Sequence, residues 1–238
     1  MRLGIIGAMD IEVQMLKKKM ELLGTRVVSE MHFYIGRLEG VPVVVVQSGI
    51  GKVNAAVCAQ TLCREFGVTH IINTGIAGAL NPHLDIGDIV VSCGAVHHDF
   101  DCTAFGYGNC RIPGMPTVFE ADRELGEMAF YAAYSIHPGC VVTGTIASGD
   151  QFVSSDALKA TIHDKTLEFC TGAMCAEMEG AAIAQVAYLN DVPFVILRTI
   201  SDKAGEGAVM LYEEFEIQTA ERSAQVVLEL AKLMKGDK

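Results

Sequence analysis

Three short segments of the chain place acidic side chains directly after apolar runs. They are Ser148–Phe152 (SGDQF), Ala176–Gly180 (AEMEG) and Ile200–Asp202 (ISD), and a fourth carboxylate, Glu12, follows the apolar run Leu3–Met9. In an open α/β sheet, ligands bind at the carboxyl ends of the strands. Carboxylates at four strand ends, with few basic residues nearby, favour acid–base chemistry on a neutral or cationic small molecule and do not indicate phosphate binding.

The AEMEG segment offers two carboxylates on one side of an extended chain. Side chains at positions i and i+2 of a strand point the same way, so Glu177 and Glu179 lie opposite Met178. If a helix begins at Gly180, Glu179 lies at its N-terminus, where the helix dipole favours an ionised carboxylate. Such a group suits two adjacent hydroxyls of a sugar. The alternative is a plain helix cap.

Asp202, Glu12 and Phe152 have equally specific chemical uses. Asp202 ends the most hydrophobic predicted strand, and apolar surroundings raise the pKa of a carboxyl, so it could stay protonated and act as a general acid. Glu12 could activate a water molecule as a base. Phe152 would offer a flat apolar face to a purine. The alternatives are a turn cap for Asp202, a helix cap for Glu12 and core packing for Phe152.

Hydrophobic periodicity predicts the elements that position these residues. Strands are expected over residues 2–8, 32–38, 41–47, 70–74, 87–92, 140–147, 172–176 and 193–200. Helices are expected over residues 10–22, 52–66, 122–134, 155–163, 180–189 and 213–234. This alternation predicts an α/β fold in which a mostly parallel sheet is covered on both faces, within a single domain over residues 1–238. Residues 97–118 form an aperiodic loop of a length that is usually functional or covers a partner surface.

Composition excludes several classes of partner. The 238 residues carry 29 acidic and 18 basic side chains, a net charge of −11, which would repel nucleic acid. No apolar run approaches the roughly 20 residues of a membrane helix, and no signal peptide is recognisable, so a cytoplasmic protein is expected. The eight cysteines form no C-x-x-C pair and are expected to be reduced thiols.

Cofactor and metal motifs are incomplete. Gly4–Gly7 is not a dinucleotide fingerprint, and Gly49–Val53 lacks the first glycine and the final serine or threonine of a phosphate loop. A zinc site is conceivable only with an unusual ligand spacing, formed by Cys93, His97, His98 and Cys102. The sequence therefore predicts neither a cofactor nor a metal.

Taken together, the motifs stand in a familiar order from end to end of the chain. The sequence closely resembles the 5′-methylthioadenosine/S-adenosylhomocysteine nucleosidase family through Gly4–Glu12 (GIIGAMDIE), Ser48–Val53 (SGIGKV), Asn73–Gly78 (NTGIAG), His98–Tyr107 (HDFDCTAFGY), Ser148–Phe152, Glu177–Gly180 and Arg198–Asp202 (RTISD). The resemblance implies a three-layer α/β/α fold with a mixed, partly barrel-like sheet. It also implies a homodimer that hydrolyses the N-glycosidic bond of adenine thio-nucleosides irreversibly and without a cofactor.

The resemblance also implies a role for each matching residue. Asp202 would protonate adenine N7, Glu12 would deprotonate the attacking water, and Arg198 would belong to that water's network. The substrate contacts would come from Glu179 on the ribose hydroxyls, Met178 and Met9 on the sugar, Phe152 on adenine, the Val153 backbone and the Gly78 region at the adenine edges, Ser201 on Asp202, and Ile50 and Tyr212 on the alkylthio group. In the family, the long loop crosses to the other subunit, so Cys102, Phe105 and Pro113 would complete the neighbour's pocket.

Two positions depart from the family pattern. Ile76 stands where some relatives carry serine, and Tyr212 stands where phenylalanine is common. Both changes lie near the expected site and could shift substrate preference, but neither removes a catalytic carboxylate.

Two alternatives compete with hydrolysis. A purine nucleoside phosphorylase of the same fold would need cationic donors for phosphate, and related phosphorylases place an arginine where this chain has Asn73. A non-catalytic nucleoside-binding protein could keep Phe152 and Glu179 while losing Glu12 or Asp202, yet both carboxylates are present. The sequence therefore favours a nucleosidase.

Overall fold

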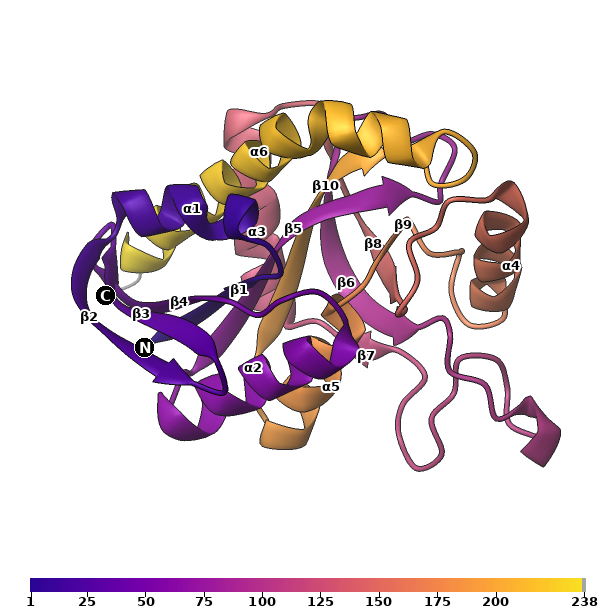
Figure 1. Ribbon diagram of the computed structural model, residues 1–238, viewed down its shortest axis with the longest axis horizontal. Helices are drawn as coiled ribbons and strands as arrows, with labels where there is room; N and C mark the ends of the chain where they lie inside the picture. The colour runs from indigo at the N-terminus through magenta and orange to yellow at the C-terminus, as the bar shows by residue number, and fades with distance from the viewer. Residues whose placement is uncertain (237–238) are drawn as a thin grey trace.

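Figure 1 shows the computed structural model, in which residues 1–236 are described. Within these residues ten strands form one sheet, ordered β10-β6-β8-β9-β5-β1-β4-β3-β2, with β7 beside β6. The strands are β1 (Leu3–Gly7), β2 (Glu21–Val28), β3 (Met31–Leu38), β4 (Val41–Gln47), β5 (His70–Ala79), β6 (Ile89–His97), β7 (Phe119–Glu120), β8 (Val141–Ser148), β9 (Cys175–Glu177) and β10 (Phe194–Asp202). The helices are α1 (Asp10–Lys19), α2 (Lys52–Glu65), α3 (Arg123–Ile136), α4 (Asp156–Leu167), α5 (Gly180–Asn190) and α6 (Ala208–Gly236).

Part of the sheet closes on itself. Strand β10 pairs with β5 as well as with β6, so β5, β10, β6, β8 and β9 form a closed five-stranded barrel. The pairs β1–β4, β1–β5, β5–β10, β6–β8 and β8–β9 are parallel, whereas the other pairs are antiparallel. The mixed, partly barrel-like sheet is confirmed. The mostly parallel sheet inferred from element alternation is wrong, because the β2-β3-β4 meander and the β10–β6 closure are antiparallel.

Helices cover both faces of the sheet, which confirms the three-layer arrangement (Figure 1). Helices α1, α3 and α6 pack on one face and α2 and α5 on the other. Side chains along β1 point alternately to the two faces of the sheet. Leu3 and Ile5 therefore join the core beneath α1, while Ile6 joins the core beneath α2. Helix α4 lies apart and packs through Ile162 on a smaller cluster that includes Val153.

Several predicted boundaries are wrong. The helix expected over residues 10–22 ends at Lys19, and the edge strand Glu21–Val28 follows it. That strand escaped sequence analysis because its side chains are mostly exposed on both faces and show no apolar alternation. The strands expected over residues 70–74 and 87–92 continue to Ala79 and His97, and the last helix starts at Ala208. The extended parts of β5 and α6 supply residues that line the site described below.

The remaining sequence expectations concern cysteines, metals and membranes. All eight cysteines are free thiols. Within residues 1–236 no group of three or more candidate ligands could hold a metal, and His97 Nε2 instead contacts Gln185 Oε1 at 3.0 Å. None of the helices in this part of the chain has the length and apolarity that a membrane crossing requires.

Candidate active site

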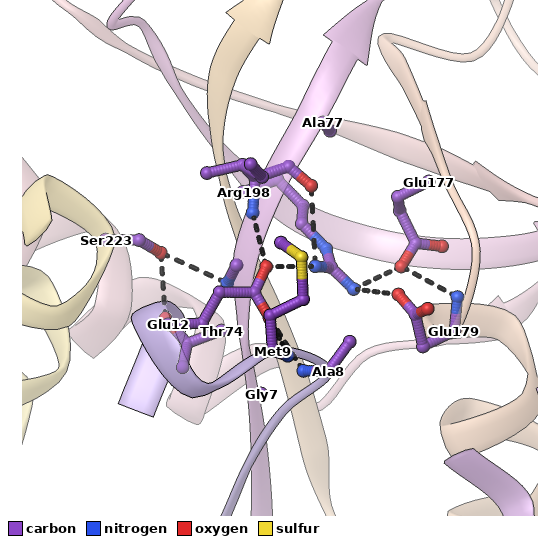
Figure 2. A network of polar contacts seen from close by, with 12 residues as sticks. Gly7, Ala8, Met9, Glu12, Thr74, Ala77, Glu177, Glu179, Arg198 and Ser223 are labelled. Carbon is purple, nitrogen blue, oxygen red and sulfur yellow. Dashed lines mark hydrogen bonds and ion pairs between the residues drawn. The ribbon is translucent and has the colours of Figure 1, made fainter. Parts of the chain in front are cut away.

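A cavity of about 330 Å³ opens at the carboxyl ends of β1, β5 and β10. Its polar floor consists of Glu12, Glu177, Glu179, Arg198 and Asp202, all of them buried. Figure 2 shows the Arg198 guanidinium between Glu12 on one side and the two AEMEG glutamates on the other. The acidic strand ends at Glu12, Glu177–Glu179 and Asp202 therefore meet in one place, whereas the fourth, SGDQF, contributes Phe152 to the cavity and its exposed Asp150 accepts the Lys52 N–H instead.

Glu12 is held by backbone donors from the turn between β1 and α1 and from strand β5. It lies in the first turn of α1, and its Oε2 accepts the backbone N–H groups of Ala8 at 2.6 Å and Met9 at 3.0 Å. Its Oε1 accepts the Ile76 N–H at 3.1 Å from β5. Glu12 thus does cap its helix, but its side chain also belongs to the lining of the cavity. Burial raises its pKa even though Arg198 and these N–H groups act in the opposite direction.

Arg198 is a buried charge at the centre of the site. Its side chain is 1% exposed, and Nη2 donates to Asn73 Oδ1 at 2.7 Å and to Glu177. The same nitrogen lies 3.5 Å from Glu179 Oε2, and Nη1 lies 3.8 Å from Glu12 Oε1. A buried cation needs such pairing because desolvating an unpaired charge is costly. Its Nε has no hydrogen-bond partner among residues 1–236.

The two AEMEG carboxylates have different roles: Glu177 caps a helix and Glu179 lines the cavity. Glu177 accepts the N–H groups of Glu179 at 3.1 Å and Gly180 at 2.8 Å, together with the Ser148 hydroxyl. Glu177 therefore caps α5, and the alternative interpretation of Glu179 as a plain helix cap is wrong. Glu179 is free to line the cavity, where its Oε1 accepts the Gly51 N–H at 2.9 Å. Burial and the neighbouring Glu177 raise the pKa of Glu179 to about 7.

A β-bulge aims Asp202 into the cavity. On β10 Ile200 pairs with Ala77 and Asp202 pairs with Gly78, which leaves Ser201 as an extra residue. The Asp202 carboxyl accepts from Ser201 Oγ at 2.9 Å and from the Ala204 N–H at 2.8 Å. Burial raises its pKa against these hydrogen bonds. Gly78 is required here, because a β-carbon at that position would lie 2.7 Å from Asp202 Oδ1.

The mouth of the cavity is apolar. Phe152 and Tyr212 meet edge to face with ring centroids 5.7 Å apart, and Tyr212 Oη donates to Met9 Sδ at 3.2 Å. Ile50 and Val209 complete this wall. The cavity thus combines a charged, dry floor with a mouth suited to an alkyl or thioether group.

Comparisons with known proteins agree with this geometry. Residues 2–232 match the phosphorylase superfamily. The 5′-methylthioadenosine/S-adenosylhomocysteine nucleosidase of Geobacillus sp. (strain WCH70) is 44% identical over 230 residues, 97% of either chain. The structure of the nucleosidase from Neisseria meningitidis in complex with methylthio-immucillin-A superimposes with a TM-score of 0.93 at 40% identity, covering 98% of this chain and 99% of that one. The nucleosidase from Colwellia psychrerythraea 34H in complex with adenine gives a TM-score of 0.92 at 38% identity, covering 97% and 94%.

This chain belongs to the 5′-methylthioadenosine/S-adenosylhomocysteine nucleosidase family. Identity above 40% over nearly the whole length of both proteins decides the matter, and the resemblance noted from the motifs is confirmed. As a member of that family the chain is an N-glycosyl hydrolase.

Most of the residues that the family pattern marked do line the cavity. Those that do are Met9, Glu12, Ile50, Gly78, Phe152, Met178, Glu179, Arg198, Ser201, Asp202 and Tyr212. Val153 lies in a smaller adjoining pocket of about 30 Å³ with Phe152 and Asp202. Phe105 and Pro113 do not line the cavity of their own chain; both are exposed in the loop after β6, Phe105 at 81%. Their contact with a second subunit stays a prediction.

Sequence reasoning missed part of the site. Glu177 received no role, although strand alternation placed it beside Glu179. Asn73 opens the NTGIAG motif and stands where phosphorylases carry arginine, but it received no role of its own, although its side-chain amide binds Arg198 and the Ile6 carbonyl. Val209 and Glu213 line the cavity from α6. Val209 carried no recognisable signal because it lies in the first turn of α6, which was not predicted, whereas Glu213 lies in the predicted helix but in no recognisable motif.

Proposed function

We propose that this protein hydrolyses the N-glycosidic bond of 5′-methylthioadenosine and S-adenosylhomocysteine, with Asp202 as general acid and Glu12 as general base. One observation carries the choice of hydrolysis over phosphorolysis. Among residues 1–236, Arg198 is the single basic side chain that lines the cavity, and it is already engaged by Glu177, Asn73 and the nearby Glu12 and Glu179. A phosphate would enter a cavity dominated by carboxylates and find no free cation.

Leaving-group departure is assigned to Asp202. Adenine is a poor leaving group as an anion, so a proton delivered to N7 lets it depart neutral. The raised pKa of Asp202 supports this role because it keeps a proton on the carboxyl at higher pH than usual. Phe152 would stack on the purine, while the Val153 backbone and the Gly78 region would contact its edges.

Water attack is assigned to Glu12. As the bond to adenine breaks, positive charge grows on the ribosyl carbon, and water adds to that carbon while its proton passes to Glu12. This is the division of labour of inverting glycosidases. Glu12 Oε1 has one backbone donor, from Ile76, which leaves an acceptor position for water. Arg198, 3.8 Å away, would keep the carboxylate ionised before the reaction.

The remaining contacts set the substrate class. Glu179 would accept the two ribose hydroxyls, and Met9 and Met178 would pack on the sugar. Ile50, Tyr212 and Val209 would surround the alkylthio group. Ser201 would orient Asp202, to which its hydroxyl already donates. No group of candidate metal ligands occurs in the described chain, and the scheme uses only protein side chains and water.

The homodimer is part of the proposal. Helices α2 and α5 expose apolar side chains on neighbouring surfaces, with Val53 at 75% and Leu189 at 58% exposed. The loop that carries Phe105 and Pro113 projects beyond α5 at the edge of the molecule (Figure 1). Burying these surfaces against a second copy would bring the loop to the neighbour's pocket. Within this proposal the protein acts in the cytoplasm on a diffusible nucleoside.

Adenine release from 5′-methylthioadenosine in phosphate-free buffer tests the reaction. Hydrolysis gives the same rate with and without added inorganic phosphate and yields the free thioribose. A rate that requires phosphate, with a ribose 1-phosphate as product, would establish a phosphorylase instead. Tight adenosine binding without any turnover would establish a binding protein.

A further inference from the structure

The segment that follows Asp202 adopts a backbone that needs outside support. Ala204 has a φ of 44°, in the left-handed region that residues with a β-carbon seldom occupy, and Gly205 and Gly207 have φ of 108° and 80°. Glycine adopts a positive φ without steric cost, but at Ala204 such a conformation persists only where the surroundings hold it. Because this segment supplies the Ala204 N–H to the Asp202 carboxyl, whatever holds the segment also acts on that carboxyl.

Helix α4 provides the support. Lys159 Nζ donates to the Lys203 carbonyl at 2.6 Å, and Asp156 Oδ1 accepts the Glu206 N–H at 3.3 Å. The Gly205 N–H donates to the Val153 carbonyl at 2.9 Å, just before α4 begins. Gly205 lies so close to Asp156 that a β-carbon there would collide with its carboxylate. The first turns of α4 therefore clamp the segment.

One contact reaches the Asp202 carboxyl directly. The Lys203 carbonyl and the Ala204 N–H belong to the same peptide group. Lys159 binds the oxygen end of that group at 2.6 Å, and the N–H end binds Asp202 Oδ1 at 2.8 Å. Hydrogen bonds in such a chain polarise one another, so the ammonium strengthens the bond to the carboxyl.

We propose that Lys159 is a positioning residue for Asp202, acting through the peptide group between Lys203 and Ala204. The proposal rests on Asp202 being the general acid. The Ala204 N–H of this peptide group holds Oδ1 of Asp202, and Ser201 Oγ contacts Oδ2 of the same carboxyl at 2.9 Å. The carboxyl plane is thereby set relative to the cavity before substrate arrives.

The charge of Lys159 also opposes the effect of burial on the pKa of Asp202. Burial raises the pKa of Asp202, whereas the Ala204 N–H, the Ser201 hydroxyl and the field of Lys159 lower it. The other ionisable side chains that line the same cavity as this carboxyl are Glu12, Glu177, Glu179, Arg198, Tyr212 and Glu213. Asp156 and Lys203 flank Lys159 itself. Burial alone would raise the pKa of Asp202 so far that the carboxyl would donate its proton poorly. The charge of Lys159 limits that rise.

The test compares the pH dependence of kcat/KM for Lys159→Met with the wild-type enzyme, using 5′-methylthioadenosine in phosphate-free buffer. Without the charge, Asp202 keeps its proton to higher pH. The alkaline limb is expected to move upward by about 0.5 to 1 pH unit, less than the one to three units typical of a direct ion pair. At the optimum kcat should fall about 3- to 10-fold, because a weaker acid donates less readily and the peptide is less fixed. KM should change less than about twofold.

Two further variants separate charge from structure. Lys159→Arg keeps a cation and should retain the wild-type profile; arginine does not titrate, whereas burial lowers the pKa of Lys159. Lys165→Met removes a lysine from the last turn of the same helix and should match wild type. If Lys159→Met melts below the assay temperature, Lys159→Gln is also uncharged, and the same displacement is expected.

The inference is overturned if the alkaline limb of the kcat/KM profile of Lys159→Met or Lys159→Gln superimposes on that of wild type. It is also overturned if Lys165→Met displaces the limb as far as Lys159→Met does. Asp202→Asn distinguishes this failure from failure of the proposed function. If Asp202→Asn retains the wild-type rate, Asp202 is not the acid. If Asp202→Asn is inactive while the limb of Lys159→Met does not move, only the role of Lys159 is lost.

Discussion

Arg198 Nη1 lies 3.8 Å from Oε1 of Glu12, too far for a hydrogen bond but close enough for a strong electrostatic interaction in a buried site. The other terminal nitrogen of Arg198 is bound to Asn73 and Glu177. Arg198 therefore favours an ionised Glu12 without occupying its lone pairs. A base arranged in this way keeps an acceptor position free for water.

Glu12→Gln removes the proposed base while preserving the shape of the side chain. We expect kcat to fall by about 10²- to 10⁴-fold, the usual contribution of general acid–base help, with a small change in KM because the glutamine still fills the same space. Steady-state assays of adenine release measure both constants. Activity within about tenfold of wild type would rule out Glu12 as the base.

The pH profile of kcat/KM is expected to be bell-shaped, because the two carboxyls act in opposite protonation states. Glu12 must be ionised, and its pKa is raised by burial, so activity falls as the pH drops through that raised value. Asp202 must be protonated, and burial raises its pKa too, so activity falls as the pH rises through it. A profile that stays flat up to pH 10 would contradict the role of Asp202.

Glu179→Gln is expected to stabilise the ligand-free protein at neutral and higher pH while weakening substrate binding. The pKa of Glu179 is about 7 in the folded protein against 4.5 as the ordinary value. The folded state therefore prefers the protonated form, and stability present below the ordinary value is lost as the pH rises through about 7. Glu179→Gln escapes this loss of stability, which is on the order of 3 kcal/mol for such a shift in pKa.

Denaturant unfolding of wild type and Glu179→Gln at pH 4.5 and pH 8 measures this difference. The gap between the two proteins should be small at pH 4.5 and largest at pH 8. The KM for 5′-methylthioadenosine should rise in the variant, because one acceptor of the ribose hydroxyls is replaced by an amide. A variant less stable than wild type at both pH values would contradict the expectation.

Gly75→Ala tests how tightly the charged floor is packed. A β-carbon on Gly75 would collide with both the Arg198 guanidinium and the Glu12 carboxylate. Both groups are buried and mutually paired, so neither can move cheaply. We expect a loss of about 1 to 3 kcal/mol in stability together with loss of activity.

Gly24→Ala is the matched control for Gly75→Ala. Gly24 lies in the edge strand β2, and a β-carbon there would meet no atom of the described residues 1–236 within 4 Å. Thermal melting and kcat should stay close to wild type. Equal effects of the two substitutions would mean that the Gly75 result reflects backbone preference and not the packing of the floor.

Much of the site could be predicted from local signals. The acidic residues Glu12, Glu179 and Asp202 were found because each follows an apolar run, and the ends of such runs converge in an α/β sheet. The role of Glu177 was harder to predict. The two-residue alternation of a strand puts Glu177 and Glu179 on the same side, but it does not indicate which of the two carboxylates caps the next helix. Backbone donors at Glu179 and Gly180 decided that in favour of Glu177.

By itself, the sequence determined the element order outside β2 and β7, the family and the identities of the groups that could carry acid–base chemistry, because these follow from local patterns of burial and from motif order. Only the tertiary structure decided that β10 closes a barrel with β5, that Arg198 sits among three carboxylates, and that Lys159 reaches the peptide beside Asp202. Each of these depends on contacts between residues far apart in the chain. Such contacts shift a pKa or aim a side chain through distance and burial, which no local pattern of residues records.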